Sequence, residues 1–227
     1  MKRAELLQKI DAAIRKRNPV LAEHYLRPGL TKKAIERLLK NVTGLTEPLF
    51  ELYSWHDGTK FVHLAPGETY KTGIKKVELF PGHRFHFVNL KLAVLGLEAL
   101  AKKAEHKLAL KEGVGKYLPF FYNGATAEFM LDLQPERESR VMFFDSQEDK
   151  PVQQAYETLD AFLAAVLHAN EANKPLGFFQ HRKLKTEKGI KGSNPNVCDL
   201  MESVAASANC AEPAQGSRED YEKNNSN

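Results

Sequence analysis

Apolar and polar residues alternate most clearly in residues 118–145, and the rest of the chain is organised around this stretch. Its short apolar runs are interrupted by turn-forming residues at Asn123-Gly124 and again at 134–140. This pattern predicts three antiparallel strands. Asn-Gly tolerates positive φ, so Tyr122 and Ala125 are expected to flank a tight reversal between the first two strands. Such a sheet needs helices to cover one face, which indicates an α+β fold.

Apolar residues recur at helical spacing in several other segments. The expected helices span 3–17, a segment capped by Thr31 that stops near Gly44, 48–55, 90–108 after a cap at Asn89, and 158–170 with a cap at Thr158. Asp57-Gly58 is expected to form the turn that ends the third helix. Residues 77–80 and 83–88 are expected to be strands, the second at a sheet edge, and 151–154 a short strand or turn. Residues 59–73 are predicted to form a loop.

The bulk composition fits one globular domain with appended segments. A chain of 227 residues that is 42% hydrophobic and 27% charged can bury one substantial core. We expect a basic amphipathic helix and connector at 1–29, an α+β domain at 30–175 and a mostly disordered polar tail at 176–227. The tail is predicted because apolar periodicity fades after Pro175.

Charge is divided unevenly along the chain. Residues 1–40 hold eleven Lys and Arg against four Asp and Glu, a net charge of +7. Residues 118–173 hold ten acidic against three basic residues, a net charge of −7. Such a division can steer a charged partner to one side of the molecule, although solvation of unlike faces produces the same pattern.

The cysteines and the N-terminal residues indicate a cytoplasmic location. Cys198 and Cys210 both lie in the polar C-terminal region, where a disulfide framework would have no fold to cross-link, so a reducing compartment fits best. Polar residues interrupt the N-terminal segment before any signal-like apolar run can form. No run approaches the roughly 20 apolar residues of a membrane span, so none is expected.

The sequence holds few candidates for chemistry. His56-Asp57 could form a general-base dyad, but neighbours in sequence seldom face each other, and a turn accounts for Asp57-Gly58. His83 and His86 would point to opposite faces of a strand, and no third ligand is usefully spaced, so no metal site is expected. The sequence contains no glycine-rich phosphate loop or nucleophile motif. We therefore predict no catalytic residue and no cofactor.

Several short motifs follow one another in an order that resembles the SUKH superfamily. They are LTEPLFELYSWHDGT at 45–59, LFPGHRFHFVNL at 79–90, YLPFFYNGATAEFMLDL at 117–133 and VMFFD at 141–145. The superfamily includes the yeast regulator of cell-wall assembly and killer-toxin resistance and many bacterial toxin-immunity proteins. The similarity covers about residues 30–170. The matching framework positions are Leu52, Trp55, Gly58, Pro81, Gly82, Phe85, Phe121, Asn123, Gly124, Leu131 and Asp132.

The resemblance implies a SUKH-like fold, in which helices cover an antiparallel sheet of about five or six strands. It also implies a non-enzymatic domain that binds a protein partner. In bacterial members that partner is typically a secreted toxin domain, often a nuclease, and in fungi it is cell-wall and signalling machinery. Two features depart from the family: the basic N-terminal helix and the tail lie outside the match, and the net charge is positive.

Three hypotheses for function follow. The first is protein binding through exposed groups on the sheet and its loops, with contact candidates Trp55, His56, Asp57, Tyr122, Asn123 and Asp132. The second is a hydrolase that uses His56 with an aspartate. The third is salt-sensitive association with a membrane or nucleic acid through the basic N-terminal helix, with nucleic acid the less favoured partner. Trp55 itself is expected to close its helix onto the sheet as a core residue.

Overall fold

The computed structural model describes residues 2–44, 46–60, 73, 75–82, 84–105, 117–124, 126–134, 139–145, 147 and 152–180, the side chains of 99–105 and 180 excepted. Three predictions fall largely or wholly outside these residues: the loop at 59–73, the pair of ligands that includes His83, and most of the tail at 176–227 with its two cysteines. The first residues of that predicted tail are described, and they include a short helix, Gly177–Gln180, with Leu176 and Phe179 buried.

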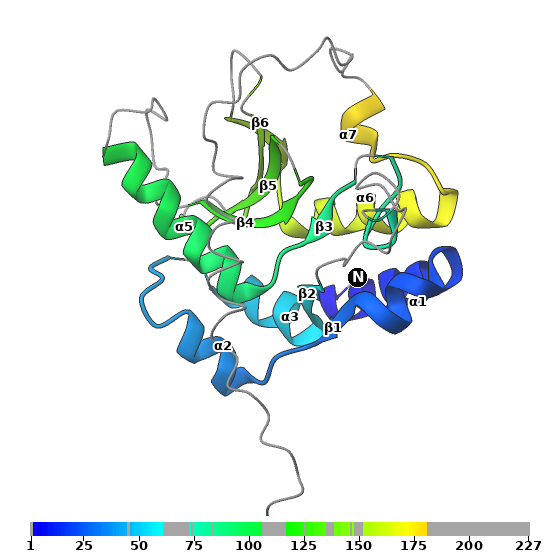
Figure 1. Ribbon diagram of the computed structural model, residues 1–227, viewed down its shortest axis with the longest axis horizontal. Coiled ribbons are helices and arrows are strands. Elements are labelled where there is room, and N and C mark those ends of the chain that lie inside the picture. Colours follow the sequence, from blue (N-terminus) through cyan, green and yellow to red (C-terminus); the bar gives the residue numbers. More distant parts are fainter. Residues whose placement is uncertain are drawn as a thin grey trace, which may run out of the picture.

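Five antiparallel strands form the main sheet in the order β3-β4-β5-β6-β7 (Figure 1). They are β3 (His86–Phe87), β4 (Tyr117–Tyr122), β5 (Ala127–Asp132), β6 (Val141–Asp145) and β7 (Val152–Tyr156). The α+β class and the three antiparallel strands between 118 and 145 are therefore confirmed. The expected edge strand at 83–88 is also present, although its strand is short: His86 and Phe87 pair with β4, and the Val88 amide donates to the Phe120 carbonyl at 2.9 Å.

The turn between β4 and β5 is wider than predicted. Tyr122 pairs with Glu128, and the Asn123 amide donates to the Ala127 carbonyl at 3.1 Å. The Asn123 side chain accepts hydrogen bonds from the amides of Thr126 and Ala127, both at 3.1 Å. Gly124 has the positive φ, 78°, that the Asn-Gly pair predicted. Asn123 therefore organises a longer loop, which its own side chain closes.

Among the described residues, six helices accompany this sheet. They are α1 (Arg3–Arg17), α2 (Lys32–Leu38), α3 (Glu47–Trp55), α5 (Leu90–Glu105), α6 (Leu159–Ala172) and α7 (Gly177–Gln180), with a short π-helical turn at Leu21–Tyr25 after α1. Helices α5 and α6 pack directly on strands of the sheet. The predicted caps are confirmed: Thr31, Asn89 and Thr158 each accept a hydrogen bond from an amide in the first turn of α2, α5 and α6.

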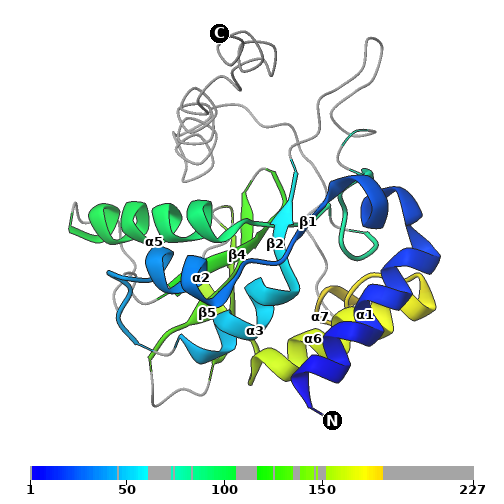
Figure 2. The same cartoon turned by 90° about the horizontal axis from the view of Figure 1, so that it is seen from below.

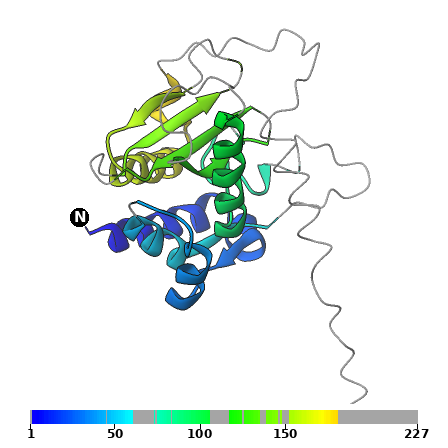
Figure 3. The ribbon, with the colours of Figure 1, turned by 90° about the vertical axis from the view of Figure 1, so that its left-hand side faces the viewer.

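Helix α6 lies between the sheet and α1 (Figure 3), and the view from below shows α1 crossing α6 (Figure 2). The apolar stripe of α1 is buried, with 3% or less exposed at Leu6, Leu7, Ile10 and Ile14. Phenylalanine side chains join α6 to the sheet; the Phe162 ring lies 5.1 Å from Phe129 on β5. The N-terminal helix therefore contributes to the same core as the sheet.

Two predicted elements are wrong. Asp57-Gly58 does not turn; it lies in β2 (His56–Thr59), which pairs antiparallel with β1 (Leu26–Pro28) in a separate two-stranded sheet. Residues 77–80 form turns and bends in place of a strand, although Leu79 and Phe80 are fully buried. The Leu79 amide bonds the Phe85 carbonyl at 3.0 Å, which satisfies it without a strand partner.

Candidate functional site

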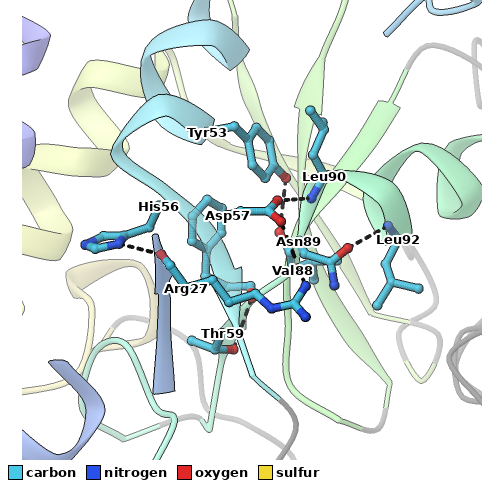
Figure 4. Close-up of polar contacts among 10 residues, drawn as sticks. Arg27, Tyr53, His56, Asp57, Thr59, Val88, Asn89, Leu90 and Leu92 are labelled. Atoms are coloured by element: carbon cyan, nitrogen blue, oxygen red, sulfur yellow. Dashed lines mark hydrogen bonds and ion pairs between the residues drawn. The ribbon is translucent and has the colours of Figure 1, made fainter. Parts of the chain in front are cut away.

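The strongest sequence candidates, Trp55, His56 and Asp57, stand where α3 ends and β2 begins. Successive side chains of a strand point to opposite faces, so His56 and Asp57 diverge. Figure 4 shows the two side chains directed to different neighbours. His56 and Asp57 therefore do not form a dyad, as their adjacency in the sequence predicted, and each residue has a separate partner.

Both ring nitrogens of His56 face acceptors. Nδ1 lies 2.7 Å from the carbonyl oxygen of Arg27, and Nε2 lies 3.1 Å from Oδ1 of Asp11. Each ring nitrogen therefore has a hydrogen-bonding partner within the protein. A general base needs a free lone pair directed at its substrate, and His56 has none in this arrangement. The structure places an aspartate, Asp11, beside His56, and both ring nitrogens are engaged within the fold; a hydrolase that uses His56 stays a prediction.

Asp11 links this histidine to α1. Its other carboxylate oxygen accepts a hydrogen bond from Arg15 Nε at 2.7 Å, one helical turn away. Burial alone would raise the pKa of Asp11, but the hydrogen bonds and charges of Arg15 and His56 outweigh it and lower that pKa. The three side chains form an ionic network that fastens α1 to the small sheet.

Asp57 caps the N-terminus of α5. Its Oδ1 accepts a hydrogen bond from the Leu90 amide at 2.9 Å, and Arg27 Nη1 lies 3.8 Å from Oδ2 (Figure 4). Burial raises the pKa of Asp57, while the Leu90 amide and the Arg27 charge act in the opposite direction. Beside it, the Tyr53 hydroxyl donates to the Val88 carbonyl at 3.2 Å. These contacts hold α3, β2 and α5 together, and they leave Asp57 a structural role.

Trp55 lies between the core and the surface. Its ring centroid is 4.6 Å from that of His56 and 6.2 Å from that of Phe87. The side chain is only partly buried, although its Nε1 is buried and has no hydrogen-bond acceptor among the described residues. The expectation of a fully buried core tryptophan is therefore met in part: one side packs on the core.

The exposed side of Trp55 borders a hollow of about 880 Å³ on the outer side of α1, α2 and α3. We call this hollow the Trp55 groove. Half-buried Phe50 and buried Leu7 provide further apolar surface. Among the described residues, the lining is Ala4, Leu7, Gln8, Lys32, Glu36, Thr46, Glu47, Phe50, Glu51, Ser54 and Trp55.

Acidic side chains predominate among the charges of the groove. Glu51 shares Arg3 with Asp160 of α6, whose carboxylate lies 2.6 Å from Arg3 Nε. Glu36, Glu47 and Lys32 are exposed and make no ion pair within the described part of the chain. The groove thus combines an aromatic floor with an acidic rim.

Sequence reasoning identified Trp55 but missed the rest of the groove. One signal was present: Phe50 is apolar but falls outside the buried stripe of Leu49, Leu52 and Tyr53 on α3. Phe50 and Trp55 line the same hollow, and an apolar surface patch, unlike a single apolar residue, indicates a contact surface. The glutamates carry no such signal, because an exposed acidic residue on a helix is ordinary.

The remaining candidates lie elsewhere and are not exposed contact residues. Tyr122 is 5% exposed and Asp132 is fully buried, because β4, which holds Tyr122, and β5, which holds Asp132, are both covered on two faces. The two stand at opposite ends of the β4-β5 hairpin, where Tyr122 pairs with Glu128 and Asp132 with Tyr117. The Asn123 side chain is hydrogen-bonded to amides of its own loop. Trp55 contacts Phe87, whereas Tyr122 contacts His86, which points to the other face of the sheet.

His86 and Glu128 accompany Tyr122 on that second face. The His86 and Tyr122 rings lie 5.3 Å apart, edge to face, and Tyr122 stands between His86 and Glu128 in the strand register. Burial lowers the pKa of His86 from 6.5 to about 4, so the ring is neutral at physiological pH. Glu128 is 1% exposed. These are buried groups of the sheet, away from the Trp55 groove.

The comparisons with known proteins add no family. A scan against protein-family models found no match, and a search of curated proteins found no match either. Among the described residues, none of the helices has the length and apolar content to cross a membrane. The same part of the chain holds no group of three or more His, Cys, Asp or Glu residues that could bind a metal ion.

Proposed function

We propose that this chain is a non-enzymatic protein-binding domain, and that the Trp55 groove is its binding surface. One observation carries the proposal: two half-buried aromatic side chains, Trp55 and Phe50, border a preformed hollow on the outside of the fold. Aromatic side chains in pockets supply most of the binding energy at protein interfaces. Because the hollow is already open, binding also needs less free energy for reorganisation of the protein.

The motif order that resembles the SUKH superfamily supports the same conclusion. For a bacterial protein of that kind, the partner to test first is a toxin domain, and for a relative of the yeast regulator it is cell-wall or signalling machinery. The positions of Cys198 and Cys210 in the sequence favour a cytoplasmic setting for this binding.

The basic N-terminal helix supports a membrane or nucleic-acid function less well. Three of its cations are used inside the fold: Arg3 by Glu51 and Asp160, Arg15 by Asp11, and Arg17 by Asn170 and two carbonyl groups. A phosphate surface would have to compete with these partners for each cation. Lys9 and Lys16 remain exposed, and two cations give a weak electrostatic attachment.

The experiment compares partner capture by three forms of the full chain. The wild type, Phe50→Ser and Val20→Ser are immobilised, and stoichiometrically bound proteins are identified by mass spectrometry. Val20, 45% exposed and outside the groove, is the matched control because it also loses an apolar surface side chain. We expect a partner that binds the wild type and Val20→Ser and binds Phe50→Ser at least about tenfold more weakly.

Thermal melts of all three forms establish that each is folded before binding is compared. A partner that binds the Phe50→Ser variant as tightly as the wild type would remove the groove from the interface. If no protein binds stoichiometrically to any folded form, the binding proposal itself fails.

A further inference from the structure

The charges around the Trp55 groove specify a kind of occupant, and this inference rests on the function proposed above. We propose that the groove binds a short amphipathic segment of a partner protein, apolar where it meets Trp55 and Phe50 and bearing lysine or arginine beside that face. The size of the hollow, about 880 Å³, is that of a site for a few side chains. It therefore suits a peptide segment better than a broad, flat protein surface.

The residues at the floor of the Trp55 groove provide the apolar part of the recognition. Leu7 on α1 is 3% exposed and closes the bottom, while Phe50 and Trp55 on α3 are half-buried and offer ring surface to an incoming side chain. Burial of an apolar side chain in such a place removes apolar surface from water, which favours binding. This part of the site would accept any apolar anchor, so it does not by itself select a partner.

The charged residues at the rim of the groove select the kind of partner segment. Glu36 on α2, Glu47 in the first turn of α3 and Glu51 one turn later give three carboxylates against one lysine, Lys32. Glu36 and Glu47 make no ion pair in the described part of the chain, and the single charge of Arg3 is divided between Glu51 and Asp160. An incoming cation thus meets Glu36 and Glu47 without first breaking an internal pair, whereas Glu51 is already paired with Arg3. A phosphate or an acidic peptide would be repelled there.

A second copy of this chain is a poorer occupant. Its basic helix α1 has the right charge, but the apolar stripe of that helix is already buried in its own core. The segment would have to leave α6 to present an apolar face. A partner segment with both features available at once suits the groove better.

Fluorescence provides a direct readout, because the chain has a single tryptophan, Trp55, and it borders the groove. Full-length protein is titrated with a Leu/Lys peptide of about 14 residues, about four helical turns, whose leucines follow helical spacing. A Leu/Glu peptide with the same leucine positions is the control ligand. We expect the Leu/Lys peptide to change the Trp55 emission saturably and the Leu/Glu peptide to leave it unchanged.

Variants of the rim test the role of charge. The double variant Glu36→Gln/Glu47→Gln should bind the Leu/Lys peptide about threefold to tenfold more weakly, and Lys32→Gln about twofold more tightly, because exposed charge pairs have modest energies. Glu171→Gln, an exposed glutamate on α6 outside the groove, is the matched control and should bind like the wild type. Raising the salt from about 0.1 M to about 1 M should weaken wild-type binding and narrow these differences.

Any other result of these titrations contradicts the proposal that the groove binds a cationic amphipathic segment. Equal binding of both peptides, or wild-type affinity in the double variant, would show that the rim does not select cations. Tighter binding of the Leu/Glu peptide would show the opposite preference. Self-association detected by analytical ultracentrifugation, if lost in Phe50→Ser, would make a second copy the occupant. The capture experiment tests the proposed function separately. In all these cases the proposed function stands if Phe50→Ser no longer captures the partner protein, and it fails if that variant captures the partner as well as the wild type does.

Discussion

The carboxylate of Asp57 accepts a hydrogen bond from the backbone amide of Leu90 at 2.9 Å, although 33 residues separate them. Leu90 is the first residue of α5, where backbone amides lack partners within the helix. Asn89 satisfies a second amide of this turn, that of Leu92, at 3.0 Å. One of the two caps thus comes from β2, which fixes the direction in which α5 leaves the sheet edge.

Removal of this carboxylate should weaken the fold measurably. We expect Asp57→Ala to lower the free energy of unfolding by about 1 kcal/mol, within the roughly 0.5 to 2 kcal/mol range of a lost helix N-terminal acceptor. Asp57→Asn keeps an acceptor oxygen, and it removes a charge that burial disfavours, so its loss should be smaller. Urea denaturation followed by circular dichroism measures both. Equal losses in the two variants would show that the hydrogen bond to Leu90 is not the cause.

Glycine at position 58 should be required for close packing within the fold. Gly58 has a φ of 76°, and a Cβ built there would lie 2.5 Å from the amide nitrogen of Asn89. We expect Gly58→Ala to cost more than about 2 kcal/mol, because a positive φ alone costs about 1 to 2 kcal/mol and the Asn89 backbone must also move. Gly177→Ala is the control, since nothing lies within 4 Å of its Cβ. Similar melting temperatures for the two variants would contradict this account.

Local signals predicted most of the helices. The apolar stripe of α1 and the capping residues Thr31, Asn89 and Thr158 act within a few positions of the residues they affect, so the sequence pattern was sufficient for them. The strands of the central hairpin were found for the same reason, since an alternating run and a turn lie side by side in the chain.

The errors arose where a distant partner decides the structure. His56–Thr59 is a strand because Leu26–Pro28 lies beside it, and nothing between positions 55 and 60 records that pairing. Gly58 does have the positive φ of a turn residue, but here it serves contact with Asn89. Residues 77–80 are as apolar as a strand, yet they are buried by packing without a strand partner.

The candidate site was predictable only in part, for a related reason. Trp55 was found because it is the single tryptophan and ends a helix. Tyr122 and Asp132 were expected to be exposed, since tyrosine and aspartate commonly are, but β4 and β5, which hold them, are both covered on two faces. The groove joins residues of three helices, and only the packing of α1 and α2 against α3 brings them together.

Buried His86 should make the fold sensitive to mild acid. Its pKa is about 4 in the fold and about 6.5 when unfolded, so the unfolded chain binds a proton first as the pH falls. The stability that neutral His86 contributes is therefore complete above pH 6.5 and is lost between about pH 6.5 and 4. The slope is at most about 1.4 kcal/mol per pH unit.

The measurement is the free energy of unfolding between about pH 4.5 and 8 for the wild type, His86→Leu and His168→Gln. Other groups also titrate in this range, so the quantity of interest is the difference between the variant and the wild type. We expect His86→Leu to lose stability less steeply in acid than the wild type. His168, exposed on α6, controls for the loss of a histidine. Parallel curves for wild type and His86→Leu would show that this ring is not the acid-sensitive group.

Trp55 has two roles that different substitutions should separate. Trp55→Ala removes the ring contact with Phe87, at 6.2 Å between centroids, and should cost about 2 kcal/mol, below the roughly 3 to 5 kcal/mol of a fully buried tryptophan. Trp55→Phe keeps an aromatic ring there and loses an indole N–H that is buried without an acceptor among the described residues, so it should cost less than about 1 kcal/mol. Urea denaturation followed by circular dichroism measures both, because neither variant retains a tryptophan. In the wild type, acrylamide should quench Trp55 to an intermediate degree, since one side of the ring packs on the core and the other borders the groove. A loss in Trp55→Phe as large as in Trp55→Ala would show that the indole N–H has an essential partner.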